Sequence, residues 1–298
     1  MAAISLMECQ SVAAQGEISF ATHDDRLTIT VGGEPFAVYA WRDGQVRRPY
    51  FAHLHAPGRL QVTRNFPPRE GQDAPDHATM HPGLWLAFGD ISAGDFWRNQ
   101  ASVEHVEFVE KPLADGRGGG FAVRNRYVAD GKPICDELCR IHIEPQKGAT
   151  LLSWDSQFSG SDNFYFGDQE EMGLGVRVAT ALAVKNGGRI VNSDGLENEA
   201  QVWGKPANWC NYGGAISGRQ AGVLLMADPR NFRRSWFHAR DYGLLVANPF
   251  GQKAFTGGLA SQVTVSKGDT LRLRFAVLFH AGEIDPAAAY CRWQSANY

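Results

Sequence analysis

The chain has 298 residues, of which 44% are hydrophobic, 20% charged and 11% aromatic. This length suits one large all-β domain or two average domains, and it can bury a substantial core. The net charge is -3, and no basic stretch stands out, which argues against a nucleic-acid partner and against binding to a membrane surface. No window approaches the roughly 18 uninterrupted apolar residues of a membrane span.

The first residues, MAAISLMECQSVAAQ, contain neither a basic segment nor a long apolar one, so no signal peptide is predicted. The five cysteines are scattered. Cys135 and Cys139 could form a metal pair on one strand, but no second pair follows, and buried free thiols are the favoured interpretation. Such thiols suit a reducing compartment, and we expect a cytoplasmic protein.

Hydrophobic residues alternate with a period of two along most of the chain, which predicts strands. A first hairpin is expected at 27–41, turning at Gly32-Gly33, and a second at 121–145, turning at Asp130-Gly131. Further strands are predicted at 150–160, 174–184, 187–193 and 221–229. A closing hairpin is predicted at 262–282, with its turn at 267–269.

Only DPAAAYCRWQSA, near the C-terminus, predicts a helix, with Asp285 as its cap and Pro286 in its first turn. The 33 glycines and 14 prolines separate short strands. We therefore predict an all-β fold, a large antiparallel β-sandwich with a short C-terminal helix. One domain is expected over 1–298, with an N-terminal extension at 1–16 and the helix within 284–298. Two long loops, 56–100 and 186–213, are expected to carry the function.

The stretch DHATMHPGLWLAFGDISAGDFW, residues 76–97, combines histidines, aspartates and aromatic residues. Asp76, His77 and His81 could bind zinc or iron. Pro82 disfavours a helical conformation for His81, so a hydrogen-bonding or acid/base role is favoured over metal binding. A histidine that only fixes the loop is an equally simple interpretation. Trp85 and Trp97 could stack against a sugar ring.

Three other segments combine charged and aromatic residues. Glu171 and Arg177 could be a general base and its neighbour, or only an ion pair. In the segment 235–250, polar residues that could clamp a ligand or transfer a proton precede an apolar strand, although an edge-strand polar cluster is the alternative. They are His238, Arg240, Tyr242 and Asn248. Trp209 and Tyr212 add aromatic rings in the segment 197–214. No nucleotide-binding or serine-hydrolase motif is present.

The stretch 76–97, with FHARDYGLLVANPF and MGLGVRVATAL, resembles a family of bacterial proteins named methane oxygenase PmoA. The resemblance extends from about Leu27 to His280, and departs at Met80-His81-Pro82, where many members have adjacent histidines and an arginine. Membrane methane oxidation would not suit a chain without a spanning segment. The resemblance implies instead a galactose-mutarotase-like supersandwich and a role in carbohydrate metabolism.

These observations predict an enzyme, an epimerase, lyase or hydrolase, that acts on a sugar or oxidised sugar by general acid/base chemistry without a cofactor. His81 or His238 would be the acid and Glu171 the base. Binding residues would be Asp76, His77, Trp85, Trp97, Arg177, Trp209, Tyr212, Arg240, Tyr242 and Asn248. A non-catalytic sugar-binding or sensing module is one alternative, and a metal-dependent oxygenase or hydrolase using His77 and His81 is another. The partner would be a small carbohydrate, and exposed edge strands allow a homodimer.

Overall fold

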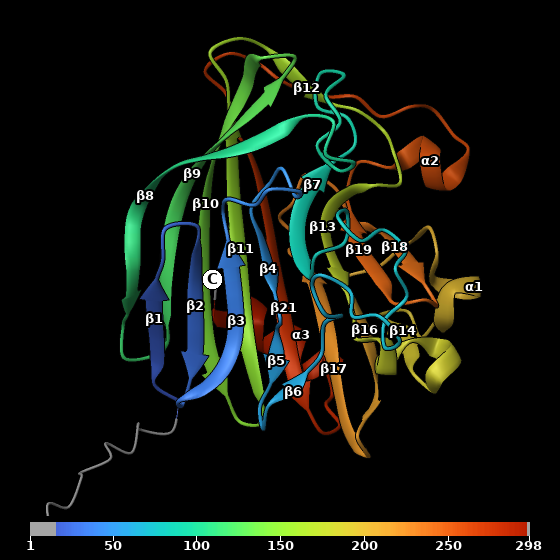
Figure 1. The fold of residues 1–298 in the computed structure, drawn as a ribbon. Coiled ribbons are helices and arrows are strands. Elements are labelled where there is room, and N and C mark those ends of the chain that lie inside the picture. Colours follow the sequence, from blue (N-terminus) through green and yellow to red (C-terminus); the bar gives the residue numbers. More distant parts are fainter. Residues whose placement is uncertain (1–15, 297–298) are drawn as a thin grey trace, which may run out of the picture.

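Two antiparallel sheets make up most of the structure, a computed structural model that describes residues 16–296 (Figure 1). The first sheet has nine strands, in the spatial order β1 (Ile18–Thr22), β2 (Arg26–Val31), β3 (Glu34–Ala40), β4 (Tyr50–Ala52), β7 (Leu84–Phe88), β13 (Met172–Arg177), β19 (Leu244–Asn248), β18 (Trp236–Arg240) and β15 (Lys205–Pro206).

The second sheet has eight strands, in the order β14 (Arg189–Asn192), β16 (Trp209–Ile216), β17 (Arg219–Ala227), β21 (Leu271–Ala281), β11 (Ala149–Ser159), β10 (Lys132–Gln146), β9 (Gly119–Ala129) and β8 (Ser102–Ala114). Two small sheets pair β5 (His55–Ala56) with β6 (Leu60–Gln61), and β12 (Phe164–Phe166) with β20 (Val263–Val265). The helices are α1 (Asn198–Val202), α2 (Gln252–Thr256), α3 (Pro286–Ala296) and the 3₁₀ turns η1 (Thr180–Leu182) and η2 (Val184–Asn186). The predicted sandwich and its C-terminal helix are confirmed.

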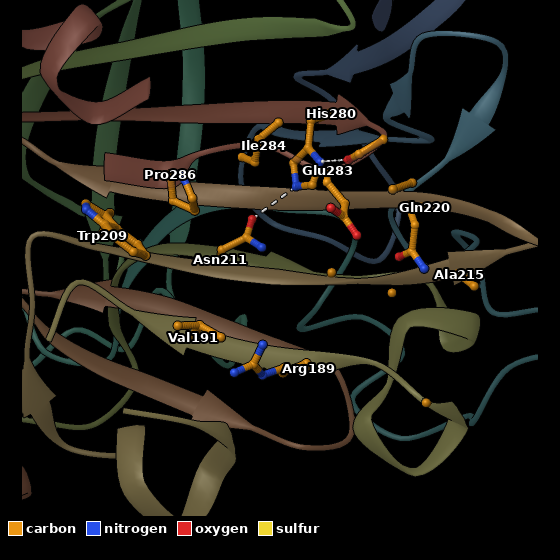
Figure 2. Close-up of a pocket in the computed structure, with 15 residues that line it drawn as sticks. Arg189, Val191, Trp209, Asn211, Ala215, Gln220, His280, Glu283, Ile284 and Pro286 are labelled. Atoms are coloured by element: carbon orange, nitrogen blue, oxygen red, sulfur yellow. Dashed lines mark hydrogen bonds between the residues drawn. The ribbon is translucent and has the colours of Figure 1, made fainter. Parts of the chain in front are cut away.

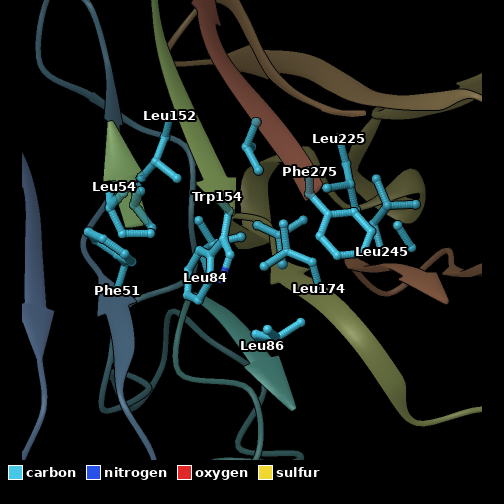
Figure 3. Packing of buried hydrophobic residues seen from close by; sticks show 14 of the residues in the cluster. Phe51, Leu54, Leu84, Leu86, Leu152, Trp154, Leu174, Leu225, Leu245 and Phe275 are labelled. Carbon is cyan, nitrogen blue, oxygen red and sulfur yellow. The ribbon is translucent and has the colours of Figure 1, made fainter. Parts of the chain in front are cut away.

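The core lies between the two sheets, because successive side chains of a strand point to opposite faces. Leu84, Leu174 and Leu245 of the first sheet are fully buried against Trp154 and Phe275 of the second (Figure 3). The residues between them in the first sheet point away from the second sheet. We call this surface the outer face of the first sheet. The second sheet has its own outer face, which α3 covers in part.

The first two hairpins, which were predicted from the residues of their turns, are confirmed. β2 and β3 pair around Gly32-Gly33, which both have positive φ angles. β9 and β10 pair around Asp130 and Gly131, with φ angles of 49° and 70°. Two consecutive left-handed residues are what a tight hairpin turn requires, and Asp-Gly supplies them with little strain. Asp285 caps α3 as expected, since its carboxylate accepts a hydrogen bond from the Ala288 N–H at 3.0 Å.

The predicted closing hairpin at 262–282 does not form. β20 pairs with β12, and β21 lies between β11 and β17 in the middle of the second sheet. The Asn163 side chain accepts a hydrogen bond from the Lys267 N–H at 2.8 Å, which ties the turn to the β12 side. β21 is buried over most of its length. A central position gives hydrogen-bond partners to the backbone N–H and C=O groups on both of its edges.

Both predicted long loops contain regular structure. β7 crosses the first sheet within 56–100, and β14 and α1 lie within 186–213. The short helices α1 and α2 were not predicted from the residue pattern. Of the expected N-terminal extension, residues 1–15 lie outside the described residues. No helix within residues 16–296 combines the length and apolar character that crossing a membrane demands.

Candidate functional site

The outer face of the first sheet gathers most of the predicted site residues. Strand register places Trp85, Gly175, Val246 and His238 in one row across four neighbouring strands. In the next row, Arg177 and Arg240 stand on either side of the buried Leu244. Residues far apart in the sequence therefore meet on this face because alternate positions of β7, β13, β19 and β18 point the same way.

A single turn presents the two histidines. The His81 N–H donates to the His77 carbonyl oxygen at 3.0 Å, although Pro82 had suggested an extended conformation for His81. His77 has a φ angle of 52°, which lets the chain enter this turn. The rings of His77 and His81 stack with centroids 4.6 Å apart, and the stack continues to Trp85 on one side and Tyr242 on the other.

Two buried arginines hold this turn. Arg64 donates hydrogen bonds to the carbonyl oxygens of Ala74, Asp76, His77 and His81.

Arg177 pairs with the Asp76 carboxylate at 2.9 Å, and its guanidinium lies 4.4 Å above the Tyr242 ring. The side chains of Arg64 and Arg177 are only 1% and 2% exposed, so these contacts are desolvated.

Asp76 also orients His77. Its carboxylate lies 2.9 Å from His77 Nδ1, which places the proton of a neutral ring on Nδ1 and leaves Nε2 as the basic nitrogen. The His77 side chain is 40% exposed, whereas His81 is buried. Burial lowers the pKa of His81 well below its ordinary value, and His77 and Arg177 lower it further. His81 is thus neutral at pH 7 and shielded from a ligand, which argues against its predicted role as the acid.

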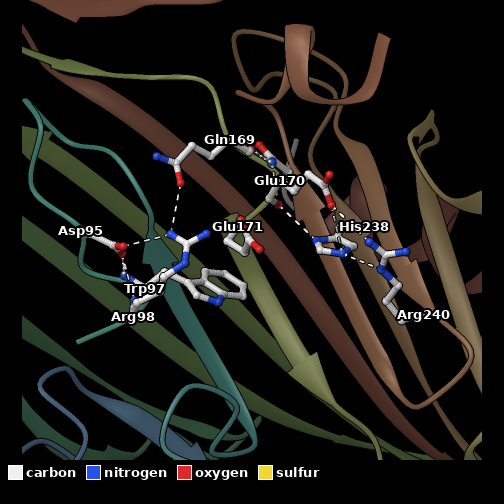
Figure 4. Close-up of polar contacts among 9 residues, drawn as sticks. Asp95, Trp97, Arg98, Gln169, Glu170, Glu171, His238 and Arg240 are labelled. Carbon is white, nitrogen blue, oxygen red and sulfur yellow. Dashed lines mark hydrogen bonds and ion pairs between the residues drawn. The ribbon is translucent and has the colours of Figure 1, made fainter. Parts of the chain in front are cut away.

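A second polar group surrounds His238 on β18 (Figure 4). Arg240 Nε donates to His238 Nε2 at 3.0 Å, so that nitrogen carries no proton and Nδ1 donates to the Glu170 carbonyl oxygen at 3.3 Å. Burial, with the neighbouring Arg240, lowers the pKa of His238 to about 4. His238 is therefore a fixed neutral ring at pH 7, which argues against its predicted role as the acid.

Glu170 is the titratable carboxyl of this group, and the sequence prediction missed it. Its Oε2 lies 3.3 Å from the Arg240 guanidinium and 3.6 Å from His238 Nε2. The side chain is 33% exposed. Partial burial raises the pKa of Glu170 despite Arg240, and the nearby Glu171 raises it further. Arg240 is also held by Glu199 of α1 at 2.8 Å, so its guanidinium stays in place beside the carboxyl.

Glu171, the predicted base, belongs to a different contact (Figure 4). Its carboxylate accepts a hydrogen bond from Arg98 at 2.7 Å, and Arg98 also binds Asp95 at 2.9 Å. Glu171 thus forms an ion pair, but with Arg98 and not with the expected Arg177, which pairs with Asp76. In the sequence, only the adjacent glutamates Glu170 and Glu171 indicated a functional position here. Residue type alone cannot tell which of the two faces His238.

The aromatic residues predicted to stack on a sugar do not reach the surface. Trp85 and Trp97 are 0% and 1% exposed, with their rings over Gly175. The partly exposed indole beside Arg240 is that of Trp203, whose ring centroid lies 5.5 Å from the Arg240 guanidinium. The partly exposed Trp236 lies at the other end of β18 and contacts Arg233. Tyr242 is also partly exposed.

Three further predicted residues have other positions. Trp209 lies on the outer face of the second sheet and does not join this site. The Tyr212 ring is buried in the core, with its hydroxyl donating to the Asp241 carbonyl oxygen at 2.8 Å. Asn248 is buried; its amide donates to the carbonyl oxygens of Gln169 and Glu170 and so positions the Glu170 backbone.

The arrangement does not favour metal binding by His77 and His81. Their rings are stacked within 14° of parallel, and His77 Nδ1 already contacts Asp76, so the two imidazoles do not converge on one point. In the part of the chain that the structure describes, no three His, Cys, Asp or Glu side chains form a group that could hold a metal ion.

A family model matches residues 26–294, the family of unknown function DUF6807. The chain belongs to this family. The resemblance to the proteins named methane oxygenase PmoA stays a prediction, because the matching model is that of DUF6807. No protein of curated function matches the DUF6807 chain.

Solved structures similar to the DUF6807 chain include an alpha-galactosidase from Lactobacillus brevis, with 8% identity and a TM-score of 0.39. The match covers 91% of this chain and 40% of the galactosidase. A galactose mutarotase-like protein from Clostridium acetobutylicum matches with 8% identity and a TM-score of 0.40, covering 91% of this chain and 99% of that one. A galactose mutarotase related enzyme from Lactobacillus acidophilus matches with 7% identity and a TM-score of 0.36, covering 90% and 100%. The chain thus spans about two fifths of the length of the galactosidase.

Proposed function

We propose that the protein acts on a sugar or oxidised sugar by general acid/base chemistry at the outer face of the first sheet. The observation that carries the proposal is Glu170, a partly exposed carboxyl with a raised pKa, held against a neutral His238 and the Arg240 guanidinium. A carboxyl that keeps its proton closer to neutral pH is suited to donate it to a sugar oxygen.

His77 is the partner base in this proposal. Asp76 accepts from Nδ1 and leaves Nε2 free to take a proton from a hydroxyl group or from a carbon next to a carbonyl group. His77 and Glu170 belong to the same outer face, and His77 contributes to the electrostatic lowering of the His238 pKa. Arg240, with 30% of its side chain exposed, can donate to hydroxyl or carbonyl oxygens of the ligand.

The substrate class is inferred from the chemistry of the exposed groups. Trp203 and Tyr242 offer partly exposed aromatic rings near Arg240, and Trp236 offers a third on the same face of β18. Flat aromatic rings beside hydrogen-bonding side chains suit a molecule with apolar C–H faces and a polar rim, as in a sugar. The buried His81, Trp85 and Arg177 would support this surface from beneath rather than touch the ligand.

The test compares the neighbouring variants Glu170→Gln and Glu171→Gln. The purified protein is incubated with aldoses, glycosides and 3-keto-glycosides, and each is followed by proton NMR for chemical change or anomeric exchange. For a substrate found in this way, we expect Glu170→Gln to lower kcat by about 10²–10⁴-fold, as for loss of a general acid. Glu171→Gln should lower it by much less, because that carboxylate pairs with Arg98 and acts on Glu170 only through its charge. Equal losses, or a loss confined to Glu171→Gln, would contradict the assignment.

A non-catalytic sugar-binding module is the second candidate, and the stable ion pairs of the site favour it. Arg98 and Arg240 are each fixed by two carboxylates, as in a rigid recognition surface. This candidate predicts saturable binding of a sugar without turnover, and equal binding by wild type and Glu171→Gln.

A further inference from the structure

A hollow of about 480 Å³ lies on the outer face of the second sheet, which faces away from the proposed acid/base site (Figure 2). Strands β14, β16, β17 and β21 form its floor and sides, and the segment that leads into α3 forms its rim. Trp209, which the sequence had assigned to the other site, closes one end. The proposed function uses none of these residues.

Paired glycines create the hollow. Strand register places Arg189, Gly213, Gly222 and His280 in one row across four strands, so two neighbouring strands lack side chains at its centre. A Cβ atom at Gly222 would lie 2.6 Å from His280 Nε2, so that glycine makes room for the histidine. A Cβ atom at Gly213 would meet nothing closer than 3.3 Å. Glycine inside a strand weakens the sheet and is typical of a place where a ligand or backbone approaches closely.

The polar groups of the hollow are mainly hydrogen-bond acceptors. His280 is buried, and its Nδ1 lies 2.9 Å from the Gly282 carbonyl oxygen, which fixes the ring proton on Nδ1. Burial lowers the pKa of His280, so the ring is neutral and Nε2 is an acceptor. Nε2 lies 3.0 Å from Asn211 Oδ1. Two acceptors cannot share a hydrogen bond, so a neutral ring requires the Asn211 amide to rotate, with its NH₂ group towards Nε2 and its oxygen towards the hollow.

The rim adds a carboxylate and an amide, but no unpaired cation. Glu283 and Gln220 line the hollow, and the Asn211, His280 and Glu283 side chains converge in it (Figure 2). The Arg189 guanidinium is already bound by Glu197, with Nε at 3.0 Å from a carboxylate oxygen. An acceptor-rich hollow with an indole at one end favours a neutral ligand that donates several hydrogen bonds.

We propose that this hollow is a second binding site, separate from the acid/base site, for a neutral saccharide. Hydroxyl groups would donate to the Asn211 amide oxygen and the Glu283 carboxylate, while a sugar face lies over Gly213 towards Trp209. Anionic sugars would bind more weakly because Glu283 repels them.

Fluorine NMR of protein labelled with 5-fluorotryptophan tests the proposal on each face separately. Trp209→Phe assigns the Trp209 signal, while Trp203 and Trp236 report on the other outer face. The probes are methyl β-D-glucopyranoside and maltose, with gluconate as the charged control. We expect the neutral probes to shift the Trp209 signal saturably and gluconate to shift it less. An unmoved Trp209 signal with every neutral probe would overturn the proposal, whether or not the Trp203 and Trp236 signals move.

Gly213→Ala is the decisive variant, since it fills the floor and removes a flexible residue from a strand. Its Cβ atom would lie 3.3 Å from the Ala221 carbonyl oxygen, a tight contact that a small shift of the strand relieves. We expect it to weaken the saturable Trp209 shift by about tenfold or more, with unchanged turnover at the acid/base site. Gln220→Ala, at the exposed rim, is a second variant that should weaken binding without any effect on folding. Glu170→Gln should retain full binding at Trp209. Undiminished binding by both Gly213→Ala and Gln220→Ala would contradict the proposal.

Discussion

At the scale of single residues, a buried carboxyl in the core makes stability depend on pH. Glu137 is 3% exposed, and Asn125 and Ser156 donate hydrogen bonds to its carboxyl group. Burial raises the pKa of Glu137 above its ordinary value in spite of these bonds. Between the unfolded and the folded pKa, the folded protein holds more protons than the unfolded chain. The free energy of unfolding therefore falls as the pH rises through this window.

We expect Glu137→Gln to remove this component of the pH dependence, whose slope is at most about 1.4 kcal/mol per pH unit for one proton. Urea unfolding of wild type and variant at a series of pH values from acid to neutral measures it. The variant's free energy of unfolding should fall less than that of the wild type over the interval. Parallel curves for the two proteins would show that Glu137 is equally charged in the folded and unfolded states.

At the scale of structural elements, the turn at 76–81 depends on Arg64, which binds four of its carbonyl oxygens from a buried position. Arg64→Met keeps much of the volume but removes the guanidinium that donates to these oxygens, whereas Asp76 keeps its contacts with Arg177 and His77. We expect a loss of about 2–5 kcal/mol in the free energy of unfolding. The matched control is Arg59→Met, whose side chain is 70% exposed and whose effect should stay within about 0.5 kcal/mol. Similar losses for the two variants in urea unfolding would refute the special role of Arg64.

The same scale shows what the sequence could and could not predict. Hairpins with Gly-Gly or Asp-Gly turns are local, and the pattern placed them correctly. The partner of β20 could not be found in this way, because β12 lies about a hundred residues away and only the assembled sheet selects it. The proposed site shows the same limit. Residue type alone singled out the histidine turn and His238 as candidates, whereas the proposed choice of Glu170 over Glu171 depends on which of two adjacent side chains points towards β18.

At the scale of the whole molecule, one hydrophobic cluster joins the sheets. Residues from both ends of the chain contribute to it, from Ile18 in β1 to Phe279 in β21. Removing either sheet would expose the apolar face of the other, so neither is expected to persist alone. We propose that the described chain is a single domain, and that the acid/base site and the hollow on the opposite outer face share one rigid support.

This proposal predicts a single cooperative unfolding transition. In differential scanning calorimetry, the calorimetric and van't Hoff enthalpies should agree, as they do for a two-state domain. A core substitution at the sheet interface such as Leu174→Ala, in a residue with 0% exposure, should lower the free energy of unfolding by about 2–5 kcal/mol. In Leu174→Ala, the fluorine NMR signals of folded Trp209 on the second sheet and of folded Trp236 on the first should disappear on heating at one common temperature, lower than that of the wild type. If Leu174→Ala shifted only the Trp236 transition, the sheets would be independent units, and a ligand in the hollow could not influence the stability of the acid/base site.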